Sequence, residues 1–458
     1  MGTNIEAHMR SSLQRSARAV TVADDLPARV ERRIRLRRRQ ARGVRLAVAA
    51  FVVAAVGAAS VTIVDGRGDG ISEVMAPAVG SPAEGMWEPL PEAPISARFQ
   101  HAAVWTGDEM IVVGGYDGGE DGEGGAAAYS PATGTWRRLA DPPDEVRGAP
   151  IAVWTGSEVV AFGGDVDSST HGAAYDPEAD DWRTVAEAPL GALISTFSHA
   201  VWTGDQVLVA GFLRTGDDDE GTVGRGAALF DPATDEWIEL PEAPDTRPFG
   251  DAVWTGDELV FIAHDDGSGS RAPQRMVASA LDPEARTWRE LPVPPLDVRS
   301  QPLVAWSGSE VIVGGGHAFS DTGMQGTYVD AAAFDPVTDT WRALPDAPAP
   351  FQGSDRYVDV AVDGRVIAFD TANQGGRVLV LDPATGRWDR APAPNRPDLT
   401  DDGELPGRRE APVVSTGRQA LAWGGGVARI ESDGNAWGCC RPVGEGAAFT
   451  PPVVAPAG

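Results

Sequence analysis

Five arginines recur at a fixed distance from a repeated apolar segment and could act together. Each stands seven residues before the position where a short apolar run ends, usually in tryptophan; they are Arg98, Arg147, Arg247, Arg299 and Arg408. A guanidinium presents a planar fork of N–H donors that suits carboxylates and phosphates. A ring of such groups would bind an anion. The alternative is structural, with each arginine capping backbone carbonyls between neighbouring units.

The other residue types with chemical potential give weaker signals. No two of the six histidines have metal-ligand spacing, so we predict no metal and no cofactor. Carboxylates cluster in residues 117–125 and 216–221, but neither segment fits a calcium-binding EF-hand loop, and solvated loops are expected. The two cysteines, Cys439 and Cys440, are adjacent. In an oxidising compartment we expect them to form a vicinal disulfide.

Charge is divided unevenly along the chain. Residues 1–64 contain 12 arginines and four acidic residues, a net charge of +8, whereas residues 65–458 contain 26 arginines and 63 acidic residues, a net charge of −37. The acidic body would repel the phosphates of nucleic acid, which is therefore excluded as a partner. The 55 glycines and 36 prolines favour a turn-rich all-β protein.

A unit that recurs from residue 98 onward must position the arginines. It opens with an apolar run ending in Trp-Thr-Gly, as at Trp105, Trp154, Trp202 and Trp254. A second apolar run follows and is often closed by paired glycines, as at residues 114–115. A third run ends in an aromatic or leucine residue, usually followed by Asp-Pro, and a tryptophan stands seven residues later.

This last spacing predicts a β-hairpin in every unit. Aspartate begins the turn, proline fixes φ, and the aromatic residue and the tryptophan lie on paired strands. The spacing holds in six units, for Tyr129 and Trp136, Tyr175 and Trp182, Phe230 and Trp237, Leu281 and Trp288, Phe334 and Trp341, and Leu381 and Trp388.

The order of paired glycine, Tyr-Asp and tryptophan, at about 50 residues per unit, resembles the kelch repeat. The resemblance covers residues 86–458 and implies an all-β, seven-bladed β-propeller of four-stranded blades around a channel. It also implies that the residue opening each repeat lies near the channel mouth, where some kelch propellers use arginines to hold acidic peptides. Galactose oxidase, another member, needs copper with a Tyr–Cys cross-link, which this chain's adjacent cysteines do not suit.

The seventh unit is incomplete and predicts how the propeller closes. It reaches Phe449 but has proline at the tryptophan position, whereas Trp87 lies upstream of the first unit in a segment like the tails of other units. We therefore predict that residues 86–91 supply the outer strand of the last blade, beside the strand that ends at Phe449. Such closure leaves no open blade to fray.

The N-terminal region predicts a membrane anchor. Residues 46–64 are 19 uncharged residues, enough to span a bilayer as a helix, and eight arginines precede them within residues 31–45. The expected organisation is a basic cytoplasmic tail (1–43), one transmembrane signal anchor (44–64), a flexible linker (65–85) and an extracytoplasmic propeller (86–458). A cleaved signal peptide is the alternative.

The predicted function is binding. A propeller tethered to the cell membrane would present loops to a protein, peptide or envelope glycan, most of all through repeats three, four, five and seven, whose loops are longest. The protein is expected to be a monomer. The alternatives are a carbohydrate-active enzyme, which would need converging carboxylates or histidines at the channel mouth, and a sensor that signals through the basic tail.

Overall fold

The computed structural model describes residues 79–81, 85–118, 125–164, 170–190, 192–193, 198–215, 222–243, 250–264, 275–320, 323–351, 360–369, 378–391, 408–409, 411–430 and 437–452. The chain divides into two compact units, Met1–Glu73 and Val74–Gly458, and all described residues belong to the second. Within them the structure is β throughout, apart from a single 3-10 turn, η1 (Asp144–Val146). No helix in this part of the chain is long and apolar enough to cross a bilayer.

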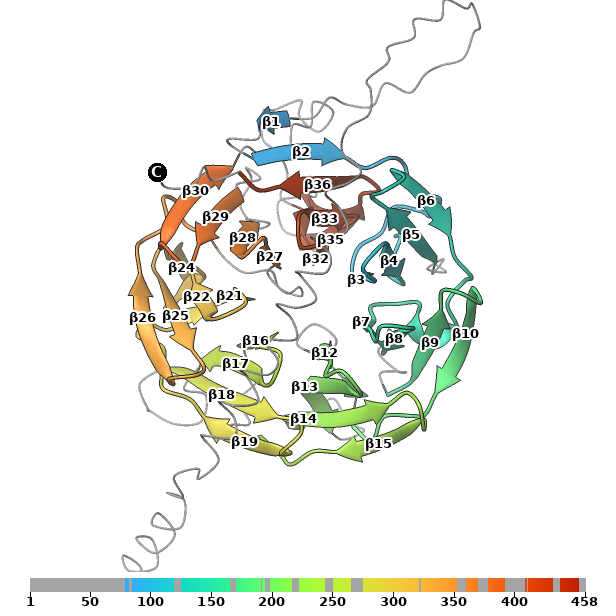
Figure 1. Cartoon of the computed structure of the whole chain (residues 1–458), viewed down its shortest axis with the longest axis horizontal. Coiled ribbons are helices and arrows are strands. Elements are labelled where there is room, and N and C mark those ends of the chain that lie inside the picture. Colours follow the sequence, from blue (N-terminus) through green and yellow to red (C-terminus); the bar gives the residue numbers. More distant parts are fainter. Residues whose placement is uncertain are drawn as a thin grey trace, which may run out of the picture. The chain divides into compact units, whose positions relative to one another are not determined.

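The repeated strands form antiparallel sheets that stand around a common axis (Figure 1). Five sheets have four strands each. They consist of β3 (Ala102–Trp105), β4 (Met110–Val113), β5 (Ala126–Ser130) and β6 (Thr135–Arg138); β7 (Ile151–Trp154), β8 (Val159–Phe162), β9 (Gly172–Asp176) and β10 (Asp181–Val185); β16 (Gly250–Trp254), β17 (Leu259–His264), β18 (Met276–Asp282) and β19 (Thr287–Glu290); β21 (Leu303–Trp306), β22 (Val311–Gly314), β25 (Ala331–Asp335) and β26 (Thr340–Leu344); and β27 (Val360–Val362), β28 (Arg365–Phe369), β29 (Val378–Asp382) and β30 (Arg387–Ala391).

Two further sheets have five strands and two have three. The five-stranded sheets consist of β1 (Val79–Ser81), β2 (Gly85–Pro89), β32 (Val413–Ser415), β33 (Ala420–Trp423) and β36 (Gly446–Thr450); and of β11 (Ala192–Leu193), β12 (His199–Trp202), β13 (Val207–Thr215), β14 (Thr222–Asp231) and β15 (Glu236–Glu239). The three-stranded sheets consist of β20 (Arg299–Ser300), β23 (His317–Ser320) and β24 (Gly323–Thr327); and of β31 (Arg408–Arg409), β34 (Gly426–Ile430) and β35 (Trp437–Pro442).

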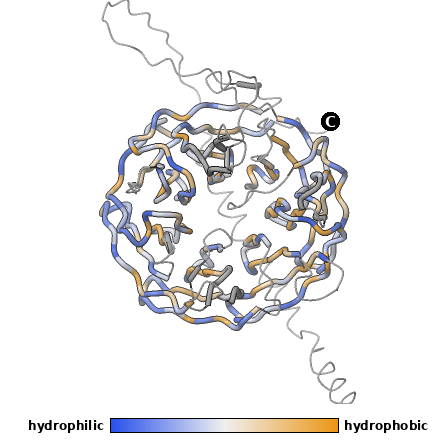
Figure 2. The backbone as a smooth tube through the Cα atoms, turned by 180° about the vertical axis from the view of Figure 1, so that it is seen from behind, coloured by the Kyte–Doolittle hydropathy of each residue, from blue (hydrophilic) through white to orange (hydrophobic). Residues whose placement is uncertain are grey.

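The core lies between neighbouring sheets. One cluster joins Ile111 and Ala128 of the first sheet to Val159 and Tyr175 of the second, all at most 1% exposed. The second strand is buried throughout in four of the five four-stranded sheets, while the outer strands are largely exposed or half-buried. Figure 2 accordingly shows hydrophilic stretches recurring around the outer rim.

The predicted hairpins are confirmed in all six complete units. Tyr129 faces Trp136 across β5 and β6, and the five other pairs are in the same register. The turn needs a left-handed residue in its fifth position, where φ is 65° at Gly134 and 51° at Asp180. Glycine and aspartate are among the residues that adopt this conformation most readily.

Each of these tryptophans also ties its sheet to the preceding one. The indole Nε1 donates a hydrogen bond of 2.7–3.0 Å to a backbone carbonyl just beyond the preceding outer strand, as from Trp136 to Pro91. An indole N–H that packs between sheets usually finds such an acceptor. The tryptophan spacing therefore encodes contacts between sheets as well as the hairpin.

The predicted closure is confirmed. Strand β2 pairs with β36, with Trp87 opposite Phe449 and ring centroids 4.8 Å apart. Leu90 N continues the ladder with a 3.0 Å bond to the carbonyl of Gly446. The sheet also begins earlier than expected, because β1 pairs with β2 and lies inside the range 65–85 predicted as a linker.

Candidate ligand site in the central cavity

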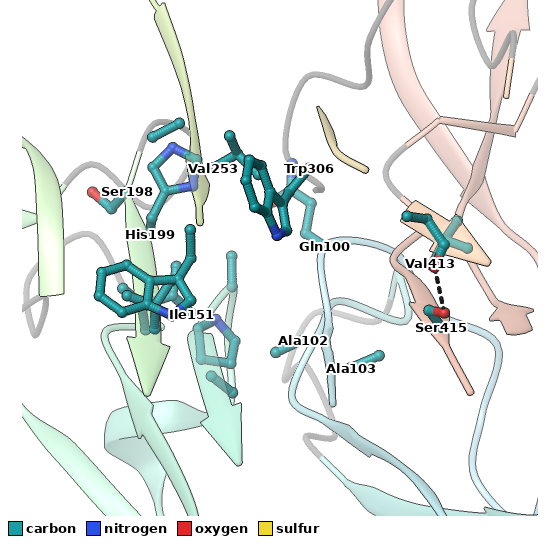
Figure 3. Close-up of a pocket in the computed structure, with 18 of the residues that line it drawn as sticks. Gln100, Ala102, Ala103, Ile151, Ser198, His199, Val253, Trp306, Val413 and Ser415 are labelled. Carbon is teal, nitrogen blue, oxygen red and sulfur yellow. Dashed lines mark hydrogen bonds between the residues drawn. The ribbon is translucent and has the colours of Figure 1, made fainter. Parts of the chain in front are cut away.

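The innermost strands surround a cavity of about 560 Å³ (Figure 3). Neighbouring inner strands are in contact: β3 with β7, β7 with β12, β16 with β21, β21 with β27, β27 with β32, and β32 with β3. Small apolar side chains make most of the wall, among them Ala102, Ala152, Ala200, Ala252, Ala361 and Val413. This volume and this lining are typical of a small-ligand site.

A few polar and aromatic groups interrupt the apolar wall. Trp254 and Trp306, at the ends of β16 and β21, line the cavity together with Gln100, Ser198 and His199. Gln100 has φ of 60°, a conformation that non-glycine residues seldom adopt. Figure 3 shows His199 and Trp306 among the side chains that face the cavity.

One imidazole–carboxylate pair lies at this wall. Nε2 of His199 is 3.8 Å from Oδ1 of Asp251 on the neighbouring sheet, and the two side chains are 13% and 25% exposed. That separation exceeds a hydrogen bond, so these two atoms do not form the direct acid–base contact that the enzyme hypothesis required. Among the described residues, no three His, Cys, Asp or Glu side chains are grouped to hold a metal ion.

Two of the five predicted arginines, Arg98 and Arg299, do not face the cavity. Both side chains are buried, at 1% and 0% exposure, and neither lines the cavity. Arg98 donates to the carbonyls of Ser96, Gly114 and Gly125, at 3.0–3.4 Å, and to the hydroxyl of Ser96. Its guanidinium therefore serves the backbone rather than a ligand.

Arg299 repeats this arrangement and adds a charged partner. It donates to the carbonyls of Asp297 and Gly315 and forms a fork with both carboxylate oxygens of Asp330, at 2.8 and 3.0 Å. Its guanidinium carbon also lies 4.2 Å from the centre of the Tyr328 ring. The structural alternative considered for the sequence thus describes both arginines.

The other three predicted site residues stand apart. Arg147 is 44% exposed, pairs with Asp144 at 2.8 Å and does not line the cavity. Arg247 lies outside the described residues. Arg408 contributes backbone to β31, opposite Val427, and its side chain lies outside the described part. The same holds for the side chains of Cys439 and Cys440, whose backbone belongs to β35, so the disulfide remains a prediction.

His101 is enclosed beside Arg98. It is 1% exposed, and burial, with Arg98 as a lesser cause, lowers its pKa to about 3. Its ring lies 5.4 Å from that of Trp423, in the last sheet of the chain. His101 therefore helps to close the contact between the first and last sheets as a neutral side chain.

The two faces of the propeller differ in their connections. In the four-stranded sheets consecutive strands are antiparallel, so successive connections alternate between the two faces. The connections from first to second strand and from third to fourth strand therefore share one face, the turn face. The turn face carries tight connections such as 106–109 and 131–134. The loop face carries the connections from second to third strand and from one sheet to the next.

Three raised hairpins stand on the loop face. The strands β13 and β14 continue beyond the ladder that β13 shares with β12, and the pairs β23–β24 and β34–β35 belong to the two small sheets. They arise from repeats three, five and seven, three of the four repeats predicted to shape a site. The corresponding loop of repeat four, residues 265–274, lies outside the described residues, as do most of the acidic segment 117–125 and all of 216–221.

Sequence reasoning selected only one of the polar and aromatic residues that line the cavity. His199 lies just before a first strand, a position that predicts a side chain near the channel mouth, and it does line the cavity. Trp254 and Trp306 mark the repeat, and Gln100 carries no motif. The available signal was the inner-strand pattern of alanine and valine before the tryptophan, which leaves room at an axis where larger side chains would fill it.

The chain matches known families in two regions. Residues 97–143 match the family described as "Kelch motif", and residues 166–398 match the family described as "Protein of unknown function (DUF1668)". The chain is also similar to the "Kelch-like protein terF" of Aspergillus terreus (strain NIH 2624 / FGSC A1156), with 27% identity over 296 residues. The aligned region is 61% of this chain and 63% of that relative, less than two thirds of its length. Kelch repeats generally mediate interactions between proteins.

Proposed function

We propose that this chain is a seven-bladed binding propeller that recognises a partner protein or peptide through its loop face. The chain belongs to the kelch-repeat propellers and to the family described as "Protein of unknown function (DUF1668)". The observation that carries the proposal is the difference between the faces. One face consists of tight turns, while the other bears the three raised hairpins around the cavity. Variable loops on a rigid scaffold are where binding sites of repeat proteins concentrate.

Seven blades follow from assigning each four- or five-stranded sheet to one repeat. The described residues contain seven such sheets, and the two three-stranded sheets extend the loops of the fifth and seventh repeats. The pairing of β2 with β36 completes the last blade across the chain ends. A closed ring keeps the loops at fixed distances from one another, which lowers the entropy lost when a partner binds.

The proposed setting is outside the cytoplasmic membrane. The 19 uncharged residues at 46–64 and the arginine-rich segment before them favour a signal anchor with the N-terminus inside. Protease treatment of intact spheroplasts tests this arrangement. Degradation of the propeller, with a tag at the N-terminus protected, is expected; protection of both parts would refute it.

The binding proposal is tested by site-specific photocrosslinking in cells. A photoreactive residue at Asp117 or His317 places the probe on the loop face, and one at Asp108 or Val337 places it on the turn face. We expect one discrete protein adduct from the loop-face positions and none from the turn-face controls. Equal adducts from both faces would refute the assignment, and a carbohydrate adduct would show the partner to be a glycan.

A further inference from the structure

We propose that the central cavity binds a slender aliphatic cation, an alkylammonium group carried on a chain of methylenes. This site is separate from partner recognition by the loop face, because it depends on the inner strands and on the cavity's turn end. Three features support it: the apolar wall, a pair of indoles and the sign of the surrounding charge.

The wall of the cavity suits a methylene chain. Alanine and valine side chains from different sheets make most of it, so it offers apolar contact along its length and few hydrogen-bonding groups. A broad polar ligand such as a sugar ring would leave its hydroxyl groups without partners against this wall, which disfavours its binding. A narrow aliphatic chain has no such groups between its ends.

Two indoles mark the turn end of the cavity. Trp254 and Trp306 end the inner strands of adjacent sheets, and both contribute to the cavity wall. The face of an indole attracts an ammonium group more strongly than any other aromatic side chain does. Trp202 occupies the equivalent position on β12 but does not line the cavity, so it provides an internal comparison.

The charge around the cavity favours a cation. The residues that line it in the described part of the chain include neither arginine nor lysine. The tight turns after the inner strands carry Asp108, Asp205, Asp257 and Asp363, against two basic residues that follow the turn glycine, Arg365 and Arg418. Residues 65–458 have a net charge of −37, so the field of the whole body attracts cations and repels anions.

A carboxylate behind the wall sets the length of the preferred ligand. Asp251 does not line the cavity, but its Oδ1 lies 3.8 Å from Nε2 of His199, which does. Asp251 belongs to the same strand as Trp254, three residues earlier, and at strand rise the two positions are roughly 10 Å apart. This is the scale of a short linear diamine, with one ammonium at the indoles and the other beside the His199–Asp251 pair.

Isothermal titration calorimetry on the full-length chain in mild detergent, at low ionic strength, tests the proposal. The probes are 1,5-diaminopentane, its neutral analogue 1,5-pentanediol and its anionic analogue pentanedioate. We expect binding of the diamine alone, weakening as salt is added. A peptide with one central lysine shows whether the ammonium comes from a free amine or from a protein, according to which binds more tightly.

Variants then assign the site. Trp306→Leu keeps apolar bulk but removes the indole, and should weaken diamine binding between about 2-fold and 30-fold. Asp251→Asn should weaken the diamine more than a monoamine of equal length. Trp202→Ala is the matched control and should leave affinity unchanged, with circular dichroism confirming folding. Absence of diamine binding at 10 mM, roughly, would overturn the proposal, since weaker binding is below any useful affinity. Equal binding of the diol, or an equal loss in Trp202→Ala, would also overturn it.

Discussion

Replacing Arg299 tests whether the repeated arginines are structural. Its guanidinium is fully buried and joins the backbone carbonyls of Asp297 and Gly315 to the carboxylate of Asp330. The variant Arg299→Met keeps most of the side-chain volume and removes every one of these bonds. It leaves two carbonyls and a carboxylate without this donor, and the methionine still shields the carbonyls from water.

The expected loss follows from the partners. Removing one member of a buried ion pair costs about 3–5 kcal/mol, and the carboxylate of Asp330 is 38% exposed, so water recovers part of this. We therefore expect the free energy of unfolding to fall by about 2–4 kcal/mol. Arg299→Lys should show an intermediate loss, because an ammonium cannot form the two-pronged contact.

Equilibrium denaturation in urea, followed by tryptophan fluorescence, measures the change. The matched control is Arg147→Met, since Arg147 is 44% exposed and its pair with Asp144 is on the surface. Exposed pairs contribute about 0–1 kcal/mol. If the free energy of unfolding of Arg299→Met lies within about 0.5 kcal/mol of the wild-type value, the buried guanidinium does not stabilise the segments that it joins.

Three further predictions concern the packing between sheets. Trp87→Ala should lower the free energy of unfolding by about 3–5 kcal/mol, because it removes a 6%-exposed indole that packs on Phe449 and closes the last sheet. Urea denaturation measures the loss, and a change below about 1 kcal/mol would contradict this role. Tyr175→Phe should reduce the sensitivity of folding to acid. The Tyr175 hydroxyl donates a 2.7 Å hydrogen bond to the Asp180 carboxylate and lowers the pKa of that carboxyl group. The stability contributed by this bond is therefore fully present above the ordinary pKa of aspartate and is lost as the pH falls through the lowered pKa. Urea midpoints between pH 6 and 3 should fall less steeply in the variant than in the wild type, and parallel curves would argue against the bond. Burial holds the pKa of His101 at about 3, below its ordinary value of 6.5. The unfolded chain therefore takes up a proton first, and the free energy of unfolding falls as the pH drops below 6.5. His101→Leu should flatten this part of the same titration, and an unchanged slope would contradict the assignment.

The hairpins could be predicted from sequence because their determinants are local. A turn that begins with Asp-Pro fixes the register of the strands beside it, so Trp182 stands seven residues after Tyr175 in sequence and opposite it in the sheet. The closure by Trp87 could be predicted by counting, because one unit lacked its tryptophan and one tryptophan lacked its unit. Neither inference needed knowledge of how the sheets pack.

The fate of the arginines could not be predicted in this way. The spacing that places Arg98 and Arg299 at the start of a repeat is compatible with a side chain that faces the axis or one that turns into the wall. The choice depends on carbonyls of the paired-glycine segments and, for Arg299, on Asp330, which is 31 residues away. Long-range acceptors of this kind exist only after the sheets have formed.

The sequence by itself determined the kelch repeat, the strand pairings and the closing strand, since each depends on short-range spacing repeated many times. The tertiary structure decided which side chains meet at the axis. Trp202 and Trp254 stand in the same local sequence, Ala-Val-Trp-Thr-Gly-Asp, yet Trp254 lines the cavity and Trp202 does not. The physical reason is that equivalent inner strands pack against different side chains of the neighbouring sheets, so equivalent tryptophans differ in how much of the ring reaches the cavity.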